Sequence, residues 1–204
     1  MPRMSEAEKQ RSHARILDAA ASLLREKGIE ATSVGDIMQA AGMTHGGFYR
    51  HFDSKSSLVA DAFRHAVDGV VGEMESAETE AERTGAREAY INQYLSAKHV
   101  TRRGTGCPLA SLAAGLARDE SPAFGVAAET VGRMAGLLDE SGTESNQQGM
   151  AVMALLLGTV ALARLSRNDV DLADMLQAGK RGVQLLHERW DSPAVDKQPL
   201  KDAK

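Results

Sequence analysis

A run of 14 uncharged, mainly apolar residues, from Met150 to Ala163, constrains the fold of this chain more than any other segment. The run is shorter than the roughly 17–25 residues that a membrane-spanning helix needs. A helix built from it is apolar all the way round, whereas a helix with one face in water carries a polar stripe. The run therefore predicts a helix that is covered on both sides.

Two arrangements can supply that cover: a central position inside one subunit, or a partner subunit. The segment at 171–190 also carries more apolar residues than one buried face needs, which favours the partner. Aromatic residues are only 4% of the sequence, which disfavours a β-sandwich or barrel. We therefore expect an all-α protein that forms a homodimer through helices at about 145–166 and 171–190, with a simple core helix as the alternative.

Charge and cysteine content narrow the class further. The formal net charge is -4, so the whole molecule is not a polycation that coats nucleic acid. Residues 1–65 hold nine Lys and Arg against eight Asp and Glu, so the more acidic part of the chain follows them. The N-terminal sequence lacks the apolar core of a secretory signal, and a single free cysteine suits a reducing compartment. We expect a cytoplasmic protein that does not enter a membrane.

Helix start and stop signals are dense in the first 60 residues. Ser5 with Glu8 forms a capping box, and Gly28 ends the helix predicted over 6–27. Ser33 caps a second, short helix that stops at Gly42, and Thr44 can cap a third over about 45–51. A long fourth helix follows over about 53–76. Two short helices joined by a tight glycine-containing turn form a helix-turn-helix.

The third helix carries two kinds of residue. Phe48 and Phe52, four positions apart, can anchor one face in a small core. Thr44, Tyr49 and their neighbours His45 and Arg50 then point elsewhere, as groove docking or phosphate contact requires. A merely solvated face is the alternative that this spacing leaves open.

Residues 32–58 resemble the N-terminal module of the TetR family of transcriptional regulators. The motif residues that carry the resemblance are Ala41-Gly42, Thr44, Gly46, Phe48-Tyr49, His51-Phe52 and Ser54-Lys55. Two positions depart from the family pattern: Gly47 stands where relatives more often have Ser, Thr or Ala, and His45 where Lys is frequent. The departures bear on the operator sequence rather than on DNA binding itself.

The resemblance implies roles for individual residues toward double-stranded operator DNA. Thr44, Tyr49 and Lys55 are expected to hold phosphates, with His45 and the Gly46-Gly47 surface near the bases. His51 is expected to orient the turn. The full set assigned to DNA binding is Ser33, Thr44, His45, Gly46, Gly47, Tyr49, His51 and Lys55. The family also implies a two-fold dimer, whose recognition helices stand about 34–36 Å apart.

The second region reads as further helices at about 86–101, 108–118, 122–139, 145–166 and 171–190. We expect a helix-turn-helix domain over 1–52, a ligand-binding and dimerisation domain over 53–190, and a disordered tail over 191–204. The resemblance implies a pocket for a small-molecule effector, but it does not identify the effector. The candidate lining residues are Tyr90, Tyr94, Cys107, Leu112, Phe124, Met134 and Met153, although for each of them taken singly a plain core position is the favoured alternative.

Cys107 is the most individual residue of this region. It precedes Pro108, which favours the first position of a helix, so Cys107 is expected to be the N-cap. Helix N-termini and nearby cations such as Arg102 and Arg103 stabilise thiolates, which predicts a lowered pKa and a sensor of oxidants or electrophiles. The Gly-Cys-Pro turn resembles that of TetR-type regulators with such a role. A small apolar lining residue is the alternative.

Other function classes find little support. The sequence contains no GxSxG, P-loop, dinucleotide-binding glycine pattern or HExxH, so we expect no enzyme and no cofactor. The histidines lack the compact spacing of a zinc site, so we expect no metal. The remaining alternative to a ligand-responsive repressor is a helical ligand- or protein-binding module without DNA binding.

Overall fold

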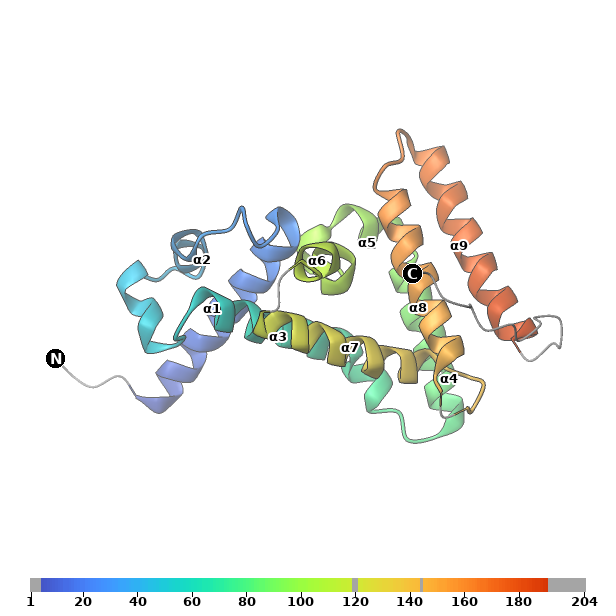
Figure 1. Cartoon of the computed structure of the whole chain (residues 1–204), viewed down its shortest axis with the longest axis horizontal. Helices are drawn as coiled ribbons and strands as arrows, with labels where there is room; N and C mark the ends of the chain where they lie inside the picture. Colours follow the sequence, from blue (N-terminus) through green and yellow to red (C-terminus); the bar gives the residue numbers. More distant parts are fainter. Residues whose placement is uncertain (1–4, 119–120, 144, 191–204) are drawn as a thin grey trace, which may run out of the picture.

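The computed structural model describes residues 5–118, 121–143 and 145–190, and every regular element in those ranges is a helix. Figure 1 shows α1 and α2 at one end of the molecule and a hairpin of α8 and α9 at the other. Helices α3 and α7 run side by side between the two ends. No helix in the described ranges is long and apolar enough to cross a membrane. The expected tail at 191–204 lies outside the described residues.

The N-terminal helices begin and end where their local signals predict. Ser5 and Ser33 each close a capping box, with Glu8 and Asp36 respectively. Gly28 and Gly42 both adopt positive φ, at 86° and 68°, a conformation that only glycine takes without strain. The elements are α1 (Glu6–Lys27), α2 (Val34–Ala40), the 3₁₀ helix η1 (His45–Arg50) and α3 (Lys55–Glu75).

The middle of the chain differs from the expected single helix over 86–101. Two helices stand there, because Leu95 leaves helical geometry and Ser96 accepts a hydrogen bond from His99 N to start a new helix. The first of them, α4 (Glu80–Tyr94), also begins six residues before the predicted start at 86. The elements are α4 (Glu80–Tyr94), α5 (Ala97–Thr101), the 3₁₀ helix η2 (Arg103–Thr105), α6 (Pro108–Leu116) and α7 (Pro122–Leu138).

The apolar run forms α8 (Gln147–Ala163), which packs against α7 and α9 (Asp169–Arg189). A glycine lets α8 and α9 approach each other closely, because a Cβ on Gly179 of α9 would stand 2.6 Å from Thr159 Cγ2 of α8. The other helices of the chain cover the α8–α9 hairpin on one side only. Apart from Tyr49 and Phe124, the large apolar side chains exposed in the described ranges lie on α8, α9 and their connection; they are Met150, Leu162, Leu165, Val170 and Leu185.

Candidate nucleic-acid interface and effector cavity

The η1 turn separates a buried face from an exposed one. Phe48 is 1% exposed and stacks on Phe52, with 5.8 Å between ring centroids, so both predicted anchors lie in the core. Tyr49, the next residue, is 73% exposed and meets the Phe48 ring edge-on. Thr44, His45 and Arg50 are exposed as well. The turn thus presents a polar, aromatic and basic surface on a fixed apolar base.

The backbone at the start of η1 is open to close approach. Thr44 is the N-cap residue, yet its side chain makes no capping hydrogen bond, so its hydroxyl is free for another partner. A Cβ on Gly46 would meet no atom within 4 Å, whereas one on Gly47 would contact Met38 Cε at 3.6 Å. Gly46 therefore faces open space. Ser33 is occupied locally, because its hydroxyl accepts from Asp36 N and donates to the Asp36 carboxylate.

Lys55 lies in the first turn of α3, half-buried. Its Nζ donates a hydrogen bond of 2.7 Å to the Ile29 carbonyl oxygen, which ties α3 to the end of α1. An ammonium group has three N–H donors, so this bond leaves two for another acceptor. His51, expected to orient the turn, packs near His13 and Phe52. Burial, followed by the nearby His13, lowers the pKa of His51.

Three of the predicted effector-site residues come together in the second region. Tyr90, Tyr94 and Cys107 line one cavity of about 210 Å³, with His99 and Gly106. Tyr90 and Tyr94 are buried, with ring centroids 5.6 Å apart. His99 forms hydrogen bonds with two other residues of the cavity wall. Its Nε2 accepts from Cys107 N at 2.9 Å, so its Nδ1 carries the proton and donates to the Tyr94 carbonyl oxygen at 2.7 Å.

The other candidates lie elsewhere. Leu112 lines a separate cavity of about 720 Å³ between the α1–α2 connection and α6. Phe124 is 44% exposed at the start of α7, because the residues of that helix that face the core are Ala123, Val126 and Ala127. Met134 and Met153 are buried among core side chains and line none of the cavities described here. These four residues do not share a site with the two tyrosines.

The prediction that Cys107 is the N-cap of α6, with Pro108 following it, is confirmed. The predicted lowering of its pKa is wrong: burial raises the pKa of the Cys107 thiol, and the α6 amides and Arg25 offset it only in part. The cation that acts on the thiol is Arg25 of α1 rather than Arg102 or Arg103. A buried, protonated thiol is a poor nucleophile.

Sequence reasoning missed Arg25, His99 and Arg164. Arg25 donates to the Gly106 carbonyl oxygen across 81 positions, a contact without a local sequence signal. His99 stands eight positions before Cys107, which pattern rules do not connect. Arg164 did leave a signal, as the single charge that ends a long uncharged helix. No group of three metal-binding side chains occurs in the part of the chain that the structure describes.

Comparison with known proteins agrees with this geometry. The family model described as "Bacterial regulatory proteins, tetR family" matches residues 16–62, which contain α2, η1 and their packing partners. The repressor KstR2 of Rhodococcus jostii is 47% identical over 57 residues, which are 28% of this chain and 28% of KstR2. An uncharacterised regulator of Mycobacterium tuberculosis, Rv0196, is 28% identical over 184 residues, 84% of this chain and 93% of that one.

A solved structure extends the likeness to the whole fold. Reduced NemR of E. coli matches with a TM-score of 0.65 and 20% identity, covering 83% of this chain and 95% of NemR. At that identity the match concerns the fold alone. The helix-turn-helix motif and the matched family model lead to one conclusion: residues 16–62 form the N-terminal module of the TetR family of bacterial regulatory proteins.

Proposed function

We propose that this protein is a DNA-binding transcriptional repressor that acts as a homodimer and leaves its operator when a small molecule binds. The observation that carries the proposal is the η1 surface, where Tyr49 is 73% exposed beside a buried Phe48. An exposed aromatic side chain on a rigid helical turn suits contact with a phosphate backbone. Residues 1–52 would serve as the DNA-binding domain and 53–190 as the effector-binding and dimerisation domain.

Residue roles follow from the placement of each group. The free Thr44 hydroxyl, the Tyr49 hydroxyl and the two remaining Lys55 donors would bind phosphates. His45 and the open Gly46 backbone would lie next to base edges, with Gly47 behind them. Ser33, already bonded to Asp36, would act by fixing the start of α2. His51 would hold η1 against α1 and not contact DNA itself.

The apolar side chains of α8 and α9 support a dimer. Leu162 and Leu165 are 56% and 76% exposed, and Val170 and Leu185 are exposed on α9. Large exposed apolar side chains gathered on two neighbouring helices are costly in water and are typical of an interface. Two-fold pairing of α8 and α9 would present two η1 turns to successive major grooves.

The cavity of Tyr90, Tyr94 and Cys107 is the candidate effector site. Its two tyrosine rings, together with the polar side chains of Gln93 and Thr105, suit a small ligand that combines an apolar part with hydrogen-bonding groups. Because burial raises the thiol pKa, we favour reversible binding over modification of Cys107. A Cys107→Ser variant would then stay fully responsive to the effector, whereas a covalent sensor would lose its response.

The test is selection of bound genomic fragments by the full chain, followed by gel shift with the recovered DNA. Tyr49→Ala should weaken binding to cognate and random DNA alike, because a phosphate contact carries no sequence information. Phe124→Ala, which removes another exposed ring that lies on α7 and not on η1, is the matched control and should bind normally. A protein that recovers no fragment would instead be a ligand- or protein-binding module.

A further inference from the structure

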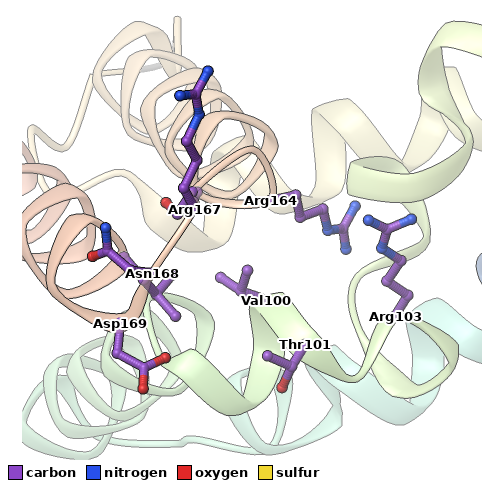
Figure 2. A pocket seen from close by; sticks show the side chains of 10 residues that line it. Val100, Thr101, Arg103, Arg164, Arg167, Asn168 and Asp169 are labelled. Carbon is purple, nitrogen blue, oxygen red and sulfur yellow. The ribbon is translucent and has the colours of Figure 1, made fainter.

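Two arginines from distant parts of the chain face each other across a cavity of about 370 Å³. Arg164 is the C-cap of α8, and Arg103 is the first residue of η2. Figure 2 shows their guanidinium groups turned toward one another, while Arg167 points away from the pair. Two cations side by side repel, so this arrangement calls for an anion between them.

Neither guanidinium group has a carboxylate within 4.0 Å among the described residues. Arg164 Nη1 donates to the Ala110 carbonyl oxygen at 2.8 Å, but its Nε and Nη2 are buried without a hydrogen-bond partner. Ser166 Oγ is likewise buried and unpartnered. Burial, then Arg103, lowers the pKa of Arg164. Buried donors on a cation are expensive to leave unpaired.

The rest of the cavity wall is partly apolar and partly polar. Its apolar residues are Val100 of α5, Ala163 of α8 and Leu172 of α9, and its other polar or charged residues are Thr101, Ser166, Arg167, Asn168 and Asp169. The Asp169 carboxylate forms no ion pair with either arginine among the described residues. Arginine's planar fork matches carboxylates and phosphates, and the three apolar residues can contact a short hydrocarbon group attached to them. We propose that the cavity binds an organic anion, a carboxylate or phosphate ester with a short apolar group, whose charged end lies between Arg103 and Arg164.

Such a ligand would act on the N-terminal helices through η2. Gly104, the residue after Arg103, packs on α1 so closely that a Cβ there would stand 2.8 Å from Ser22 Oγ. Arg25 of α1 holds the far end of η2 through the Gly106 carbonyl oxygen at 3.2 Å. An anion that draws Arg103 toward Arg164 therefore pulls on the segment that α1 rests against. The binding step stands apart from the proposed function, and only its effect on DNA rests on that function.

Binding is measured by titration calorimetry on the full chain without DNA. The probes are hexanoate and hexyl phosphate, with 1-hexanol as the neutral analogue and inorganic phosphate as the anion without an apolar group. At least one organic anion should bind more tightly than both analogues. The measured difference between hexanoate and hexyl phosphate tells a carboxylate site from a phosphate site.

Variants of Arg103 and Arg164 test the contribution of each arginine to binding. Arg103→Gln should weaken binding about tenfold or more, the loss that a charge-assisted hydrogen bond carries. Arg102→Gln, at a neighbouring residue that is also exposed but does not line the cavity, is the matched control and should bind like the original protein. Arg164→Lys keeps the charge at the end of α8 but loses the fork, and should also weaken binding.

Several results would overturn the proposal. It fails if neither organic anion binds, if 1-hexanol binds as well as the tighter of the two organic anions, or if Arg103→Gln and Arg102→Gln behave alike. A variant at Arg103 that dissociates the dimer without any anion binding would assign the arginines to a subunit contact instead. If anion binding holds but DNA affinity is unchanged, the link through η2 is wrong. Complete absence of DNA binding would refute the proposed function and leave the calorimetric result standing.

Discussion

Gly149, in the first turn of α8, is the position where a single added methyl group should damage this fold most. A Cβ there would overlap the Ala135 carbonyl oxygen and stand 2.8 Å from Asp139 N. Both are backbone atoms of α7 and its C-terminus, so no side chain can rotate away. Ordinary contact begins at about 3.4 Å, so the Asp139 contact alone requires a shift of 0.6 Å.

A displacement of α8 relative to α7 at Gly149 would also disturb neighbouring contacts. Gly149 N donates to Asp139 Oδ2 at 3.0 Å, and Val152 and Leu156, further along α8, are buried in the core. Overpacking of this kind costs about 1–3 kcal/mol and occasionally more, while alanine gains about 1 kcal/mol over glycine in a helix. Because backbone atoms are overlapped, we place Gly149→Ala at a net loss of about 2 kcal/mol or more.

The control is Gly132→Ala in the middle of α7. A Cβ on Gly132 meets nothing within 4 Å, so only the helix propensity changes and the chain should gain about 1 kcal/mol. Thermal unfolding followed by circular dichroism should lower the Tm of Gly149→Ala by about 4–8 °C and raise that of Gly132→Ala by about 2–4 °C. Equal shifts in the two variants would refute the close packing of α7 on α8.

Three further predictions concern titration, assembly and thiol reactivity. Burial lowers the pKa of His99, so as the pH falls this imidazole is protonated in the unfolded chain before it is protonated in the folded one. The free energy of unfolding should therefore fall as the pH drops below about 6.5, and urea titrations of His99→Gln should show a weaker fall. Leu165→Glu should sediment as a monomer at micromolar concentration with unchanged helical circular dichroism, and a variant that stays dimeric would remove α8 and α9 from the interface. Iodoacetamide at pH 7.5 should alkylate Cys107 more slowly than free cysteine, since burial raises the pKa of its thiol; a faster reaction would restore the sensor role.

Local signals were enough for the N-terminal helices. The Ser33 box, the positive φ of Gly42 and the Phe48–Phe52 pair act within four residues of chain, so composition and spacing report them directly. The same local rules missed the break at Leu95, because Ser96 caps α5 without a glycine or proline to mark it. Their local character explains both the success and the error.

The sequence by itself determined the all-helical class, the helix-turn-helix and the N-cap position of Cys107, because hydrophobic period and capping depend on neighbours along the chain. Only the tertiary structure decided the chemistry of the second region. Burial raised the pKa of the Cys107 thiol, which the helix terminus and Arg25 would by themselves lower. Folding also brought Arg103 to Arg164 across 61 positions of sequence. Desolvation and charge depend on distance in space, and spacing in the sequence does not record it.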